Sequence, residues 1–178
     1  HRDPGSGALT SVETSRANLG GLKTSGLDVQ VQWNLNAVDL GMAPWIGRFS
    51  VRSQINFLTS YATQVARGAA FVERRGTIGN GLPLPTWQTF TSFTWSPGPV
   101  SIGLTWKHLP AMRDITTVTA PAAPRPSTAK YDLFDLNASW AINERFNIRA
   151  GVRNLFDRDP NVVAGTPGST IAGVYDTI

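Results

Sequence analysis

Residues able to do acid–base, nucleophilic or metal chemistry are few in this sequence, and they do not cluster. The sequence contains two histidines, His1 and His108, and no cysteine. A disulfide scaffold and a thiolate metal site are therefore excluded, and no histidine stands in a pattern that indicates a catalytic triad. We interpret His108 as packing near a strand end rather than binding a metal. The pattern predicts no catalytic, cofactor-binding or metal-binding residue, and we do not expect an enzyme.

Two short segments resemble functional motifs without completing them. The glycine-rich run at 76–81 (Gly-Thr-Ile-Gly-Asn-Gly) has no following Lys-Ser or Lys-Thr pair, so we interpret it as a loop and not as a phosphate-binding turn. The run at 72–75 (Val-Glu-Arg-Arg) is a small charged cluster. We interpret it as a solvated part of a loop, with contact to an anionic ligand as the alternative.

Composition limits the class of protein to which the chain can belong. Of its 178 residues, 41% are hydrophobic and only 16% are charged, whereas soluble domains carry about 25% charged residues. The net charge is +4, but the basic residues form no run, which argues against a nucleic-acid partner. No stretch approaches the ~20 consecutive apolar residues of a membrane helix. If this chain spans a membrane, it must therefore do so as strands of a closed barrel.

Alternation of apolar and polar residues recurs along the chain and predicts β-strands. Six segments show it: 26–35, 47–61, 86–96, 99–109, 131–142 and 145–156. A seventh strand at Ala8–Arg16 is less regular, and Phe90 interrupts the polar side of 86–96. We therefore predict an all-β, antiparallel fold.

The apolar faces of these strands carry no charged residue at the positions assigned to them. Large aromatic residues fall near strand ends, as in the girdles at the two interfaces of a membrane barrel. About ten residues at ~3.3 Å each, tilted by ~40°, cover the ~25 Å apolar band of such a barrel. Ordinary core packing in a soluble barrel is the alternative. The predicted girdle residues are Trp33, Phe49, Tyr61, Trp87, Trp95, Trp140, Phe146 and Phe156.

The polar faces mix small polar residues with basic ones. A wide barrel has a hydrated interior that accepts such side chains, whereas a narrow soluble barrel fills its interior with apolar layers. We expect these basic residues to face the lumen and to pair with lumenal acids; holding a plug or lining a substrate path is the alternative. The predicted lumen-facing residues are Arg48, Arg52, Lys107, Arg149 and Arg153.

Connections between the predicted strands alternate in length. Short ones at 37–46, 96–99 and 143–145 are separated by long Gly- and Pro-rich ones at 62–85, 110–130 and 157–178. Membrane barrels have short turns at one face and large loops at the other. The rhythm thus favours a membrane barrel over a soluble sandwich.

Several segments resemble the barrel of TonB-dependent receptors. The stretch 131–140 is followed by a turn and by 151–160, which contains Asn-Leu-Phe-Asp-x-x-Pro. Upstream, 18–28 reads Asn-x-Gly, five variable residues, then Gly, an aliphatic residue and an acid, and 2–7 resembles a preceding turn. The 151–160 motif is the most specific of these.

That resemblance implies a transmembrane barrel of about 22 strands in the outer membrane of a Gram-negative bacterium. An N-terminal plug domain and a TonB box would lie upstream. We expect residues 1–178 to be the C-terminal part of the barrel, a fragment of six or seven strands. We expect the plug and the final strand to lie outside this chain.

Implied partners are the remaining strands and plug, the TonB complex of the inner membrane, the lipid bilayer and a small-molecule nutrient. The nutrient would be a metal chelate, cobalamin or an oligosaccharide. In the family's orientation, the long loops face outward and the short turns face the periplasm. Two other functions stay open at this point: a passive porin or channel, and a soluble secreted β-domain that binds carbohydrate.

Overall fold

The computed structural model describes residues 5–7, 20–79, 82–122, 127–163 and 173–175, and its main feature is one antiparallel sheet. Six long strands lie side by side in chain order, with the two-residue β3 (Val72–Glu73) added to β2. Their bounds are β1 Gly21–Asn36, β2 Arg48–Gln64, β6 Trp87–Ser96, β7 Val100–Leu109, β9 Tyr131–Ala141 and β10 Asn147–Val152. The all-β prediction is confirmed. The strand predicted at Ala8–Arg16 lies outside the described residues.

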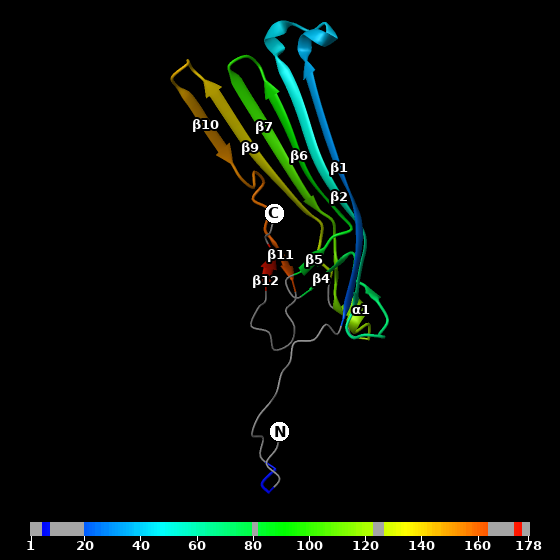
Figure 1. The fold of residues 1–178 in the computed structure, drawn as a ribbon. Helices are drawn as coiled ribbons and strands as arrows, with labels where there is room; N and C mark the ends of the chain where they lie inside the picture. The colour runs from blue at the N-terminus through cyan, green and yellow to red at the C-terminus, as the bar shows by residue number, and fades with distance from the viewer. Residues whose placement is uncertain (1–4, 8–19, 80–81, 123–126, 164–172, 176–178) are drawn as a thin grey trace.

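The sheet is curved and open (Figure 1). β1 and β10 form its two edges, and they do not pair with each other. Free edges of this length leave rows of backbone N–H and C=O groups without partners. An open sheet is what a fragment of a larger barrel must have. Among the described residues, no helix has the length and hydropathy to cross a bilayer.

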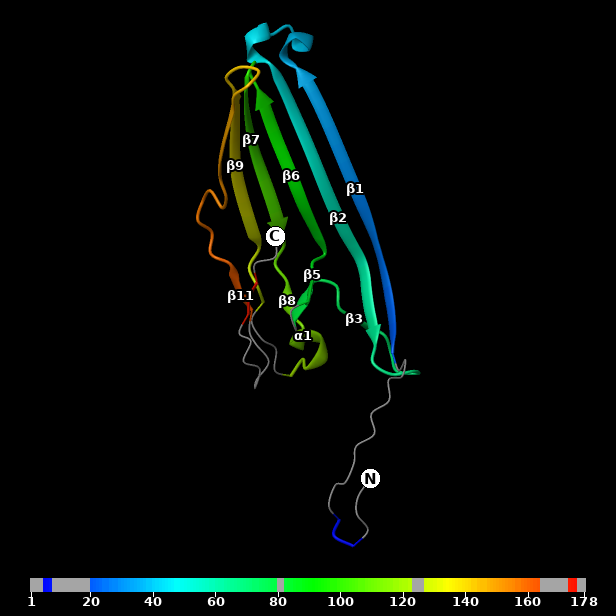
Figure 2. The same cartoon turned by 60° about the vertical axis from the view of Figure 1, so that its left-hand side comes forward.

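Short and long connections gather at opposite ends of the sheet, as the sequence predicts (Figures 1 and 2). The β1–β2 connection holds two 3₁₀ turns, η1 (Ala37–Leu40) and η2 (Pro44–Ile46), and β6–β7 and β9–β10 are joined by short turns at the same end. The opposite end holds the long segments and their small elements. These are β3, β4 (Thr77–Gly79), β5 (Leu82–Leu84), β8 (Arg113–Asp114), α1 (Thr116–Thr119), β11 (Asn161–Val163) and β12 (Gly173–Tyr175).

Two of the long connections join each other, which the sequence does not predict. β4 pairs antiparallel with β5 and parallel with β8, although β8 comes from the next long connection. Thr77 and Ile78 are almost fully buried there, and a Cβ on Gly79 would lie 2.2 Å from Cγ2 of Ile115. The interpretation as a loop is therefore wrong for 77–79, whereas 80 and 81 lie outside the described residues. β8, the parallel partner of β4, lies more than 30 positions away along the chain. A strand of three residues is also too short for an alternating pattern to predict it.

The strands differ from the sequence prediction in their bounds, since β1 begins at Gly21 rather than at 26, and in the face of one predicted girdle residue. Between Ser25 and Gly26 the β1–β2 register shifts by a β-bulge, so Tyr61 lies opposite Thr24 and on the face of Asp28. The assignment of Tyr61 to the apolar face is wrong, because one extra residue reverses the faces of everything beyond it. At the other edge, β10 ends at Val152, and the chain turns through residues with positive φ, Asn154 and Asp157.

Glu73 ties β3 to β2. Its carboxylate accepts hydrogen bonds from the Ser60 hydroxyl at 2.7 Å, the Tyr61 amide at 2.8 Å and the Arg75 amide at 2.9 Å. These bonds, the one from Ser60 first, lower the pKa of Glu73 from its ordinary 4.5 to about 2. Because the pKa is lower in the folded state, the tie is fully present above pH 4.5 and is lost as the pH falls through about 2.

We predict that β3 detaches between these two pH values. A nitroxide on an Ala70→Cys variant of the full-length protein should become mobile in electron paramagnetic resonance spectra as the pH falls through that window. In the Glu73→Gln background the mobility should no longer depend on pH. Glu144→Gln, in the turn at the opposite end, is the control and should keep the transition. Constant nitroxide mobility across the window would show that Glu73 does not hold β3.

Candidate functional site: the two faces of the sheet

The hydrogen-bonding register aligns the alternation of all six strands into two continuous faces. One row across the sheet consists only of apolar residues: Trp33, Val51, Phe93, Leu104, Leu136 and Val152. The neighbouring row, pointing the other way, consists only of polar residues: Gln32, Arg52, Ser92, Thr105 and Asp135. We call these sides the apolar face and the polar face. A slip of one residue in any pair would mix them.

Basic residues singled out from the sequence lie on or beside the polar face. Arg48 pairs with Asn36 and Ser96 in the register, and Arg149 lies opposite Ser139. Arg52 donates to the side-chain oxygen of Gln32 at 3.3 Å.

Lys107 forms the clearest ion pair of this face, with its Nζ 3.1 Å from Asp135. Arg153 follows the end of β10, on the same side as Asp135. The structure thus gives Lys107 an acid partner, as expected, whereas the partner of Arg52 is an amide.

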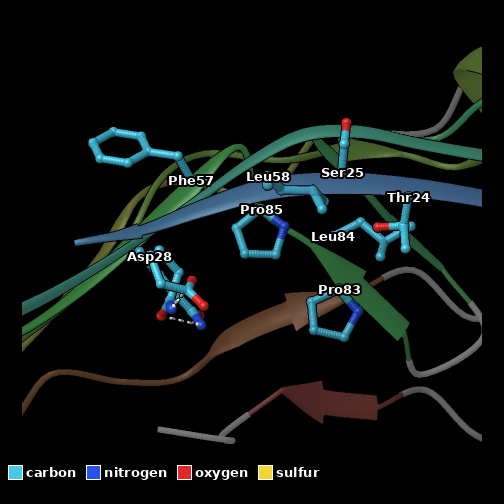
Figure 3. A pocket seen from close by; sticks show the side chains of 11 residues that line it. Thr24, Ser25, Asp28, Phe57, Leu58, Pro83, Leu84 and Pro85 are labelled. Carbon is cyan, nitrogen blue, oxygen red and sulfur yellow. Dashed lines mark hydrogen bonds between the residues drawn. The ribbon is translucent and has the colours of Figure 1, made fainter. Parts of the chain in front are cut away.

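Polar side chains also form a hydrogen-bonded ladder across β1, β2 and β6. Asn56 donates to Asp28 at 2.6 Å, and Gln88 donates to Asn56 at 3.3 Å. Pro83 of β5 and Pro85, which follows this strand, lie over the ladder, and the hollow between them and the ladder has a volume of about 380 Å³. Figure 3 shows Asp28 and the two prolines on one side of β1, with Phe57 pointing to the other side. The sequence shows the alternation of these residues but not that they meet.

Aromatic residues concentrate at the two ends of the apolar face. At the turn end, Phe49 stacks on Trp95 at 6.5 Å, and the Trp95 indole donates to the Ile46 carbonyl. Trp140 and Phe146 lie near the β9–β10 turn, and Trp33 lies one row further in.

At the loop end, Trp106 stacks on Phe134 at 6.4 Å, and Phe134 meets Phe156 edge-on at 5.4 Å. Trp87 belongs to the same end. Phe156 reaches this cluster from the turn after β10, not from a strand. Trp106 and Phe134 stand inside their strands, so their positions in the sequence do not indicate a girdle.

Asp132 is a charged residue at the loop end of the apolar face, and the alternation in the sequence does not indicate it. Asp132 lies opposite His108 in the register and accepts hydrogen bonds from the Trp106 indole at 2.9 Å and the His108 ring at 2.6 Å. Trp87 stacks on the His108 ring at 4.4 Å. Packing among aromatic rings near a strand end is the environment that the sequence predicts for His108. Within the described part of the chain, no group of three or more His, Asp or Glu residues is placed to hold a metal ion.

Comparison with known proteins gives one family. A family model described as TonB dependent receptor-like, beta-barrel matches residues 2–155. Comparisons with curated proteins and with solved structures return no match. The matched region includes all six long strands and both long connections between them. Proteins of this family are outer-membrane transporters of Gram-negative bacteria and not enzymes. The chain therefore belongs to the TonB-dependent receptor-like β-barrel family.

Proposed function

We propose that this chain is part of the wall of an outer-membrane barrel, with its apolar face against lipid and its polar face lining a hydrated lumen. One observation carries the proposal: an unbroken apolar row crosses six strands directly beside an unbroken polar row. In a bilayer a charge on the outer face is costly, and a wide barrel is polar inside. The five basic residues of or beside the polar face would then be lumenal.

Exposure supports lipid over an aqueous core. Phe93 and Leu104, which belong to the apolar row on the inner strands β6 and β7, are 41% and 36% exposed. The one cluster of buried apolar residues among those described, Leu109, Tyr131 and Leu133, lies on the polar side at the loop end. In a soluble domain the apolar face would be the buried one, and a large exposed apolar patch marks contact with another phase or partner.

The aromatic clusters at the two ends of the apolar face fit the two interfaces of the membrane. Aromatic side chains prefer this level because the ring is apolar while the indole N–H or phenol O–H stays hydrated. We propose that the turn end lies in the periplasm and the loop end outside the cell. Of the predicted girdle residues, Tyr61 is omitted from this proposal because it lies on the polar face.

We further propose that the chain forms part of a transporter that imports a scarce nutrient. The family supports a TonB-dependent transporter. In the full protein, further strands would pair with β1 and β10, a plug would fill part of the lumen, and the inner-membrane TonB complex would supply energy. Residues 1–178 would be the C-terminal part of that barrel.

A pair of arginine substitutions on β7 tests which face meets lipid. Leu104 and Thr105 are neighbours in the middle of the strand but lie on opposite faces. Arginine at the bilayer midplane destabilises a barrel by about 2–4 kcal/mol. Leu104→Arg should therefore lower the free energy of unfolding of the full-length protein in lipid vesicles, measured by urea titration, by about that amount. Thr105→Arg should have a much smaller effect, and the reverse order would place lipid on the polar face.

Energy dependence tests the transport proposal. Radiolabelled nutrients should accumulate in cells that carry the full-length protein, and deletion of the TonB gene should abolish accumulation while the barrel remains in the outer membrane. The control is a strain that lacks the transporter but keeps TonB. If uptake by the full-length protein continues without TonB, the protein is a passive channel.

A further inference from the structure

The polar face is hollowed at and beside β5. Two hollows, of about 380 and 220 Å³, share Asn56 and Gln88 in their linings. The first extends to Asp28 and the second to Gln54 and Phe90. We call these five residues the lumenal trough. Its larger hollow lies within the ~300–1,000 Å³ range of small-molecule sites.

The trough offers hydrogen-bond donors and acceptors side by side. In the ladder, one N–H of Gln88 donates to the side-chain oxygen of Asn56, and one N–H of Asn56 donates to one carboxylate oxygen of Asp28. Within the described residues, the second oxygen of Asp28, the oxygen of Gln88 and one N–H of each amide are then left for a ligand. A hydroxyl group both donates and accepts, so it matches such a mixture, whereas a cation could not use the N–H groups.

Phe90 adds an aromatic surface to this polar wall. Its side chain is 45% exposed, although its row neighbours are Gln54 and Lys107. An exposed apolar ring among hydrated groups gains stability when an apolar ligand surface covers it. One face of a pyranose ring consists of C–H groups, and the ring's edge carries hydroxyls. An aromatic face beside amides and a carboxylate therefore suits a sugar ring in shape and in chemistry.

Charges near the trough disfavour an anionic ligand. Lys107 is paired with Asp135 at 3.1 Å, and Arg52 is bound to Gln32. The charged group that lines the trough itself is the Asp28 carboxylate. An anionic metal chelate would meet this negative charge, and of the two nearby cations Lys107 is already paired with a carboxylate, whereas a neutral polyol would meet no repulsion.

We propose that the lumenal trough binds a neutral saccharide, with Phe90 stacking on a sugar ring and the Asp28, Asn56 and Gln88 side chains bonding its hydroxyls. This inference rests on the proposed function, because the sugar must enter the lumen from the loop end. It narrows the imported nutrient to an oligosaccharide.

Calorimetry on the purified full-length transporter tests the proposal. The probes are maltohexaose, xylohexaose and cellohexaose, with ferric citrate as an anionic chelate. At least one saccharide should bind, and Phe90→Ala should weaken its affinity roughly tenfold. Phe93→Ala is the matched control: it lies on the same strand, is 41% exposed and belongs to the apolar face. It should leave the affinity unchanged.

A second pair of variants keeps the test independent of the folding of Phe90→Ala. Asn56→Ala removes the middle of the ladder, and Asn34→Ala removes an amide of the same face outside the trough. Only Asn56→Ala should weaken saccharide binding. The trough is not a sugar site if no saccharide binds, or if the Phe90→Ala and Asn56→Ala variants bind saccharide as tightly as the parent protein. The same conclusion follows if these two substitutions lower only the thermal stability, which is the result expected when the plug covers this part of the wall.

Failure of this inference can be told from failure of the transport proposal. TonB-dependent uptake of ferric citrate without saccharide binding would overturn the sugar site and leave the transporter intact. Saccharide binding that depends on Phe90, with uptake that persists without TonB, would overturn the TonB-dependent mechanism and leave the sugar site intact.

Discussion

Backbone hydrogen bonding between neighbouring strands is the interaction on which the rest of this structure depends. Hydrocarbon offers no partner for an N–H or C=O group, so a chain that crosses lipid as strands must pair each of them along its length. The register that results from this pairing also fixes which side chains share a face. From Trp33 on β1 to Val152 on β10, it brings apolar residues of six strands into one row. The amphipathic wall is thus a consequence of pairing.

The long connections follow different rules, because most of their residues lie outside the six long strands. There β4 joins β8 across two connections, and the side chains of Ile78 and Met112 are buried. This small sheet also fixes the position of β5, whose Pro83 lies with Pro85 over the ladder on the polar face. The architecture of the loops therefore decides where the polar wall is hollow and where it is open.

Polar groups at the loop end of the apolar face are satisfied within the protein. The Asp132 carboxylate accepts hydrogen bonds from the Trp106 indole and the His108 ring. The hydroxyls of Ser53, Thr89 and Thr91 form hydrogen bonds with one another at 2.8 to 3.4 Å. A buried or lipid-exposed polar group is costly only when it lacks a partner. This end of the apolar face therefore carries polar residues that have partners within the protein.

Sequence by itself determined the fold class, the six strands, the alternation of short turns and long loops, and the family, because each depends on local periodicity or on a contiguous motif such as that at 151–160. It could not place Tyr61, because a bulge depends on how two strands pair and not on either strand alone. It also missed the β4–β8 pairing, the Asp132–His108 contact and the ladder from Asp28 to Gln88. These contacts join residues 24 to 36 positions apart, and only the tertiary structure decides which distant residues meet.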